Sequence, residues 1–220
     1  MNSIQGANKM PPVPVWYFPN RQPWVELILR SAITTKTRDY PRPLPYPGSI
    51  VVLYASTRAW VGAGDLTFML RNPLDMRKLV RGAVAGFALV TEVGPTATVM
   101  PLADAEYFQD VFGYNYAGTY SIRVAHPFRL PVPMKWSGRG NPGVKPHQRV
   151  PPDILNAAAD YFDTLPANVR KRLAQYQAEV EDAASQLERR LEHALFPHEA
   201  KSLEAAGQFG GIEEQIATGR

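Results

Sequence analysis

Two cationic side chains stand two residues apart in the run TTKTRDY, at Lys36 and Arg38. The β-branched threonines favour a strand here, and residues two apart in a strand project from the same face. Arginine holds a phosphate through two parallel N–H bonds, and lysine adds a point charge. The pair would therefore suit a phosphodiester or a single anionic ligand, unless both residues are simply solvated.

A long acid-free stretch supplies further candidate binding residues. From Val111 through Pro152 there is no Asp or Glu, whereas six basic residues occur. Trp136 stands between Lys135 and Arg139, and aromatic rings among cations are typical of single-strand binders. A basic loop folded against acidic helices is the alternative. The candidate ligand-binding residues are Trp24, Lys36, Arg38, Tyr40, Ser56, Arg58, Lys135, Trp136, Arg139 and Lys145.

Other chemistries lack their residues. The chain has no cysteine, and its four histidines have no paired metal-ligand spacing, so we expect neither a metal site nor a disulfide framework. The segment from Gly138 to Gly140 lacks the third glycine of a dinucleotide fingerprint, and we expect no cofactor. No apolar run approaches 18 residues, which predicts a soluble, cytoplasmic protein with no membrane partner.

The balance of basic and acidic residues in the 220-residue chain changes sign near position 150. Residues 1–150 hold 17 basic and 8 acidic side chains, and residues 151–220 hold 7 and 12. A basic segment joined to an acidic one predicts a polyanionic partner for the former. The acidic segment is then either a solvated pair of helices or a segment that covers the basic one within the same molecule.

The hydrophobic pattern predicts a helix from Pro23, strands in TTKTRDY and SIVVLYAS, and a central strand at Gly82–Val93. Residues 65–79 predict two short helices interrupted by Pro73, and residues 107–124 predict aromatic turns followed by a strand. The proline-rich segment from Pro127 onward predicts a long basic loop.

From Pro151 the composition becomes typical of helices, and Asp153 and Pro166 are suited to begin two of them. Apolar residues of the second helix form one stripe, which either docks on the preceding domain or pairs with a second copy. The predicted organisation is an extended segment at 1–20, a β-domain at 21–151, a helical extension at 152–206 and a flexible tail at 207–220.

The string QPWVELILRSAITTKTRDY resembles the opening of ASCH domains (activating signal cointegrator homology), a branch of the PUA-like superfamily. Pro47-Gly48 before IVVLYAS, the strand beginning Gly82-Ala83-Val84, and the late loop PVPMKWSGRGNPG follow in the family's order. The resemblance spans roughly Arg21 to Pro151. It implies an α+β fold, a small β-barrel with peripheral helices, whose cleft receives nucleic acid or a nucleobase derivative.

Some ASCH proteins are amidohydrolases of acylated cytidine or ribonucleases, which rely on a lysine, a threonine or glutamate three residues later, and a strand glutamate. By segment register these positions fall on Ile33, Lys36 and Leu89, and only the motif arginine is retained, as Arg38. Isoleucine and leucine neither activate a nucleophile nor transfer a proton. Glu92 would replace the acid only with a shifted register, and strand alternation places it on the opposite face.

The sequence thus favours a noncatalytic module that binds RNA or a modified single-stranded nucleobase through a basic, aromatic-lined cleft. Two alternatives stay open: a hydrolase with a rearranged site around Lys36 and Arg38, and a module that binds a partner protein or a second copy through the C-terminal helices. The sequence does not distinguish RNA from DNA or identify the base.

Overall fold

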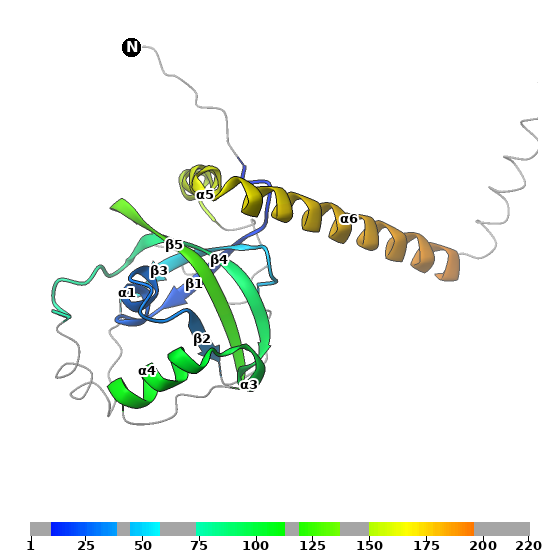
Figure 1. Ribbon diagram of the computed structural model, residues 1–220. Coiled ribbons are helices and arrows are strands. Elements are labelled where there is room, and N and C mark those ends of the chain that lie inside the picture. Colours follow the sequence, from blue (N-terminus) through cyan, green and yellow to red (C-terminus); the bar gives the residue numbers. More distant parts are fainter. Residues whose placement is uncertain (1–9, 39–44, 58–73, 113–118, 137–149, 196–220) are drawn as a thin grey trace, which may run out of the picture. The chain divides into compact units, whose positions relative to one another are not determined.

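The computed structural model describes residues 10–38, 45–57, 74–112, 119–136 and 150–195 (Figure 1). The chain divides into two compact units, Met1–Ala174 and Gln175–Arg220, and each is considered by itself. Within the described residues, none of the helices has the length and apolar character that a membrane span requires.

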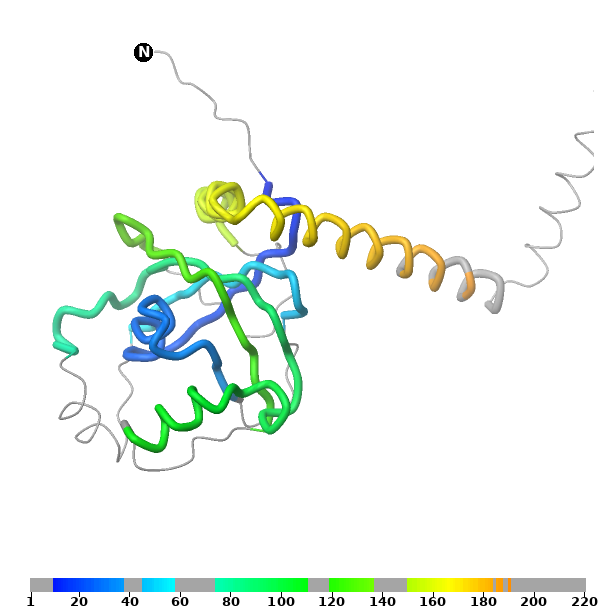
Figure 2. Tube along the Cα trace, in the orientation of Figure 1, coloured from blue at the N-terminus to red at the C-terminus, as the bar shows by residue number. Residues whose placement is uncertain are grey.

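The first unit is built on a five-stranded sheet in the order β1-β3-β4-β5-β2. The strands are β1 (Val15–Asn20), β2 (Thr35–Arg38), β3 (Ile50–Ala55), β4 (Ala83–Pro95) and β5 (Tyr120–Lys135). The β1–β3 pair is parallel and the other pairs are antiparallel. The long strands β4 and β5 run side by side and curve together (Figure 2). This curvature gives the sheet the shape of a half-barrel.

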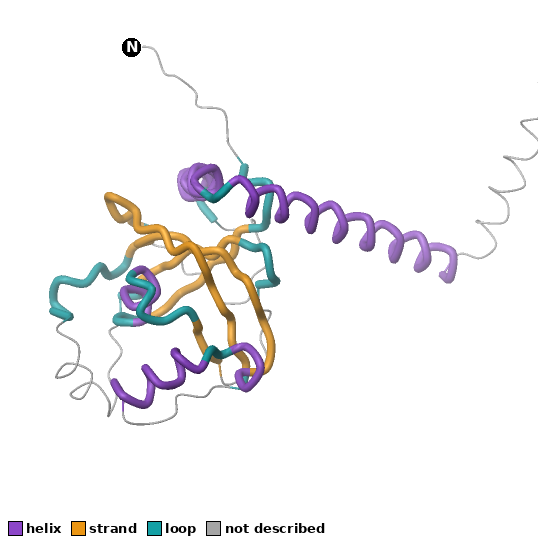
Figure 3. The backbone as a smooth tube through the Cα atoms, viewed as in Figure 1, coloured by secondary structure: helices purple, strands orange, loops and turns teal. Residues whose placement is uncertain are grey.

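The helices of the described residues are α1 (Trp24–Leu29), α3 (Thr96–Val99), α4 (Leu102–Phe112), α5 (Pro152–Thr164) and α6 (Ala167–Leu195). Those of the first unit lie around the sheet (Figure 3), and α6 continues from the first unit into the second. The predicted α+β class, with a barrel-like sheet, peripheral helices and C-terminal helices, is therefore confirmed.

Both faces of the sheet are buried, because helices pack on each. Val51 and Leu53 of β3 face a first core, which contains residues of α1 and α4. Ile50 and Val52 face a second core that contains residues of α5. Successive strand side chains point to opposite faces, so a strand covered on both sides has an almost continuous apolar sequence. This explains the apolar run IVVLYA, which was predicted as a strand.

The strand β1 lies within the segment that the sequence predicted to run extended over the surface. Val15 and Phe18 are buried, and β1 pairs with β3 from Val15↔Ile50 to Asn20↔Ala55. Pro14 and Pro19 suggested irregular structure because proline donates no backbone hydrogen bond. Since β1 is an edge strand, proline is tolerated there.

The strand β5 continues through residues that were predicted to form a loop. Its pairing moves from Leu89↔Ala125 to Phe87↔Phe128, and from Gly86↔Arg129 to Val84↔Met134. These shifts are bulges, which accommodate prolines within a strand. The loop was predicted to begin at Pro127, but the strand continues through Lys135. Residues 137–149, which were also predicted to lie in this loop, are outside the described part of the chain.

Two further helix predictions differ from the structure. The helix α4 includes Tyr107, where aromatic turns were expected. Of the two short helices predicted for residues 65–79, the first lies outside the described residues, and residues 76–78 form a turn rather than a helix. Asp75 stabilises this turn by accepting a hydrogen bond from the Arg77 backbone N–H at 3.1 Å.

The helix α5 begins after Pro151, with Pro152 at its first position, so Asp153 lies in the first turn rather than at the cap. Ile154, Ala158 and Phe162 are buried in the second core. At the start of α6, Val169 and Leu173 pack against the same core. The first part of the apolar stripe therefore docks on the sheet. In the second unit, Leu187 of this stripe is exposed.

Tyr161 fixes α5 to a bulge of β5, since its hydroxyl donates to the carbonyl oxygen of His126 at 2.7 Å. We expect Tyr161→Phe to lower the free energy of unfolding by about 1 kcal/mol, the contribution of one hydrogen bond. Burial raises the pKa of Tyr161 above 10.0, so the unfolded chain ionises first and stability falls as pH rises above 10. Urea unfolding at pH 7 and above pH 10 should show a smaller alkaline loss in the variant; an equal loss would contradict this role.

Candidate functional site

Lys36 lies inside the first core rather than on an open face. It stands opposite Ile122 in the β2–β5 pair, and the residue is only 7% exposed. Its Nζ lies 4.5 Å from the centroid of the Trp24 ring, which is a cation–π contact. Trp24 is itself buried and lies 5.7 Å from Phe108, centroid to centroid. The structure thus brings these two predicted residues together, with the tryptophan ring engaged in the core.

The remaining candidates of the predicted cleft are placed only in part. Arg38 ends β2 opposite Tyr120. Ser56 follows β3, and its backbone N–H donates to the Asn20 carbonyl oxygen at 2.8 Å. Four of the candidates, Tyr40, Arg58, Arg139 and Lys145, lie outside the described residues.

Lys135 and Trp136 lie near the opposite end of β5 from the residues that pair with β2. Lys135 is exposed and stands opposite Ala83, whereas Lys36 stands opposite Ile122. The Trp136 ring meets those of Tyr17 and Tyr54 edge-on, at centroid distances of 4.3 and 5.8 Å. The tryptophan is thus partly buried against the second core. The structure does not bring this pair into one cleft with Lys36.

The positions that correspond to a hydrolase site are apolar and buried. Ile33 belongs to the first core, and Leu89 is 4% exposed in β4. Glu92 is exposed and forms an ion pair of 2.9 Å with Arg123. Glu92 and Arg123 line a cleft of about 440 Å³ whose floor includes Ile28 and Ile33. The carboxylate and the guanidinium in this cleft neutralise each other.

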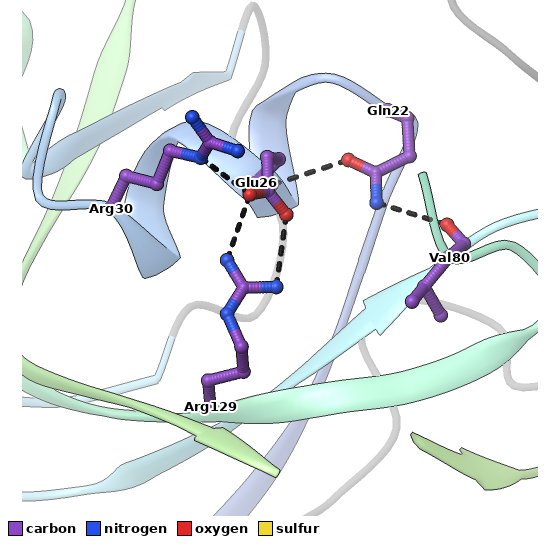
Figure 4. A network of polar contacts seen from close by, with 5 residues as sticks. All are labelled: Gln22, Glu26, Arg30, Val80 and Arg129. Atoms are coloured by element: carbon purple, nitrogen blue, oxygen red, sulfur yellow. Dashed lines mark hydrogen bonds and ion pairs between the residues drawn. The ribbon is translucent and has the colours of Figure 1, made fainter. Parts of the chain in front are cut away.

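A network of polar contacts centred on Glu26 occupies the other side of α1 (Figure 4). The Arg129 guanidinium donates to both carboxylate oxygens, at 3.0 Å from Nη1 and 2.8 Å from Nη2. Arg30 donates from Nε at 2.6 Å. Gln22 accepts a hydrogen bond from the Glu26 backbone N–H and donates to the Val80 carbonyl oxygen at 2.9 Å. The network therefore joins α1, β5 and the segment that precedes β4.

The Glu26 carboxylate is ionised in this network. Its side chain is only 7% exposed, and burial by itself would raise its pKa. Hydrogen bonds and charge from Arg129 and Arg30 outweigh burial and hold the pKa of Glu26 below its usual 4.5. A buried carboxylate with charged partners on both oxygens fixes the orientation of those partners. Glu26 thus holds two arginines in defined positions.

These arginines line a pocket of about 370 Å³. Lys78 and Asp75 line it from the turn, and Leu74, Leu79 and Val80 supply its apolar surface. Arg30 and Arg129 keep 58% and 45% of their side chains exposed, so part of each guanidinium faces solvent. Asp75 is paired with Arg77 at 3.1 Å and lies 4.0 Å from Lys78. The pocket can accept an anion.

The sequence interpretation missed this site. Glu26 lies in the helix predicted from Pro23 but was not singled out, and Arg129 was counted only as one of six cations in an acid-free stretch. The two residues are 103 positions apart. Within that stretch, Arg123 and Arg129 are each paired with an acid from elsewhere in the first unit. Two of the six basic residues of this stretch therefore lie in β5 and are already paired with acids.

Comparison with known proteins gives a structural match. Neither a protein-family model nor a curated protein sequence matches this chain. Among solved structures, the ASCH protein of Zymomonas mobilis covers 69% of this chain and 96% of its own, with 14% identity and a TM-score of 0.38. A tyrosine-to-phenylalanine mutant of that protein covers 66% and 97%, with 10% identity and a TM-score of 0.39.

Proposed function

We propose that this protein binds single-stranded nucleic acid without catalysing a reaction, and that it contacts the phosphate backbone through a basic surface beside α1. The proposal rests on one observation, the concentration of cations at the Glu26 network. This surface, called the α1 basic surface below, consists of Arg30, Arg77, Lys78, Arg81 and Arg129.

The acids within this surface are already occupied. Glu26 is covered by Arg129 and Arg30, and Asp75 by Arg77. Arg81 donates to the Met76 carbonyl oxygen from Nη2, which places its guanidinium over the same turn. An anion that approaches this surface therefore meets mostly positive charge. Phosphate contacts of this kind dominate the affinity of proteins for nucleic acids.

Base recognition has a separate location in the proposal. Ile28 and Ser31 of the α1 region line the 440 Å³ cleft, whereas Glu26 and Arg30 line the phosphate-facing pocket. An apolar floor with a polar rim suits a planar ring. Single strands offer unstacked bases, while duplexes do not. This arrangement favours a single strand, and the buried apolar Ile33 and Leu89 favour binding without hydrolysis.

The test is fluorescence anisotropy of the full chain with single-stranded RNA, single-stranded DNA and duplex DNA across a salt series. We expect Arg30→Gln combined with Lys78→Gln to weaken single-strand binding by at least tenfold. The slope of log affinity against log salt should decrease by roughly 1.4, about 0.7 for each lost phosphate contact. Lys171→Gln, which removes an exposed lysine from α6, is the control and should leave affinity within about twofold.

A second variant separates the two candidate locations. Lys36→Ala with Arg38→Ala removes the cations that the sequence favoured. Loss of binding in this variant, with normal binding after Arg30→Gln and Lys78→Gln, would move the site to β2 and overturn the α1 assignment. Failure of the unaltered chain to bind any of the three nucleic acids would reject the proposed function. Circular dichroism of each variant checks that it is folded.

A further inference from the structure

We infer that the Glu26 pocket is a seat for a terminal phosphate monoester, carried by the end of a single strand or by a mononucleotide. The inference rests on the proposed function only for the first of these two sources. It concerns the 370 Å³ pocket lined by Glu26, Arg30, Asp75, Lys78 and Arg129.

The pocket presents hydrogen-bond donors whose directions are fixed in advance. Arg30 uses Nε for Glu26, and among the described contacts its two Nη groups have no protein partner. Arg129 uses one hydrogen of each Nη, which leaves the second hydrogens and Nε. Because one buried carboxylate orients both guanidinium groups, a ligand need not order two long side chains when it binds. A tetrahedral group with several oxygens can use these donors together.

Three parts of the chain bound the pocket. Glu26 and Arg30 come from α1, Leu74 to Val80 from the turn segment, and Arg129 from β5. Gln22 closes the junction between α1 and the turn segment through its hydrogen bond to Val80. The pocket is open to solvent on its remaining side, since Arg30 and Arg129 keep 58% and 45% of their side chains exposed. A phosphodiester must direct two substituents through that side, whereas a monoester directs one. The lining therefore favours a group at which a chain ends.

Charge favours the same ligand. A monoester carries about −1.5 to −2 charges at pH 7, whereas a backbone phosphodiester carries −1. The α1 basic surface supplies five cations against two carboxylates, Glu26 and Asp75, so its net positive charge exceeds the single negative charge of a diester. The additional negative charge of a monoester is then stabilised by cations that a diester would use only in part.

The experiment compares two fluorescent single-stranded RNA decamers of the same sequence that differ only in a 5′-phosphate or a 5′-hydroxyl, each labelled at the 3′ end. Full-length protein is titrated by anisotropy at pH 7, and inorganic phosphate and AMP are titrated by calorimetry. We expect at least tenfold tighter binding of the phosphorylated decamer and measurable binding of AMP. Arg30→Gln should bring the ratio of the two affinities close to one, and Lys171→Gln should leave it unchanged.

The outcomes distinguish this inference from the proposed function. Equal, salt-sensitive binding of both decamers without binding of AMP would overturn the monoester seat and retain a backbone-binding surface. Binding of AMP without either decamer would support the seat, assign it to mononucleotides and reject the nucleic-acid function. Absence of binding to every probe would overturn both. A folded Arg30→Gln variant that still binds the phosphorylated decamer at least tenfold more tightly than the hydroxyl decamer would overturn the assignment to this pocket. Recognition of the 5′ end would then lie elsewhere.

Discussion

Replacing Gly86 by alanine is expected to lower the free energy of unfolding by about 3 kcal/mol, near the upper end for overpacking of a core. A Cβ atom at this position would lie 2.1 Å from the Phe128 carbonyl oxygen and 2.7 Å from Cδ2 of Leu29. The first of these is backbone within the β4–β5 pair, so a side-chain rotation cannot relieve it. Either the strands separate locally or α1 moves away from the sheet.

Urea unfolding followed by circular dichroism measures this change, with Gly94→Ala as the matched control on the same strand. A Cβ at Gly94 would lie 3.3 Å from Cγ2 of Val99, the end of a side chain, so the control should lose much less stability. Equal losses in the two variants would show that general strand properties, rather than close packing at Gly86, determine the effect.

Gly86 also explains which parts of the fold could be predicted from the sequence. The strand at Gly82–Val93 was predicted from its apolar run. The structure adds that Gly86 of this strand lies against Leu29 of α1 and Phe128 of β5. Local patterns thus predicted the helix α1 and the strands β2, β3 and β4. They predict where an element forms more readily than which element it contacts.

Proline accounts for the principal errors in the strands. At Pro19 and Pro131 its missing N–H suggested loops, but one lies in an edge strand and the other in a bulged part of β5. Edge position and bulges are properties of the assembled sheet. They become visible only when the pairing partners are known, and a single sequence read locally does not contain them.

The charge of residues 1–150 predicted cations and an anionic ligand, and this stays a prediction. The position of Arg129 could not be predicted, because Glu26, 103 positions away, orients it. Lys36 was favoured for its spacing from Arg38, and the structure places it in the first core beside Trp24. Spacing along a strand determines the face of a residue, while burial depends on the helix that covers that face.

Glu26→Gln is expected to have the second large effect on stability, about 2–3 kcal/mol at pH 7. Glutamine keeps the shape of the side chain but removes the charge that two arginines share. Breaking a buried ion pair by changing one partner is strongly destabilising. The loss is moderated here because Arg30 and Arg129 remain roughly half exposed and can be hydrated.

The pH dependence of this loss identifies its origin. The pKa of Glu26 is lower in the folded protein than its usual 4.5, because the hydrogen bonds from Arg129 and Arg30 outweigh burial. Its contribution to stability is thus fully present above pH 4.5 and is lost as pH falls through the lower, folded pKa. Unfolding free energies of the wild type and of Glu26→Gln should therefore differ most near neutral pH and converge as the solution becomes acidic.

Urea unfolding from pH 7 to pH 3 measures both curves, with Glu92→Gln as the control. Glu92 forms a single ion pair with Arg123, and both side chains are substantially exposed, so its loss should be at most about 1 kcal/mol. If the curves of Glu26→Gln and the wild type stay parallel over this range, the carboxylate charge does not stabilise the fold and Glu26 acts only by packing. Convergence instead means that the charge which orients the two arginines also holds α1 against β5.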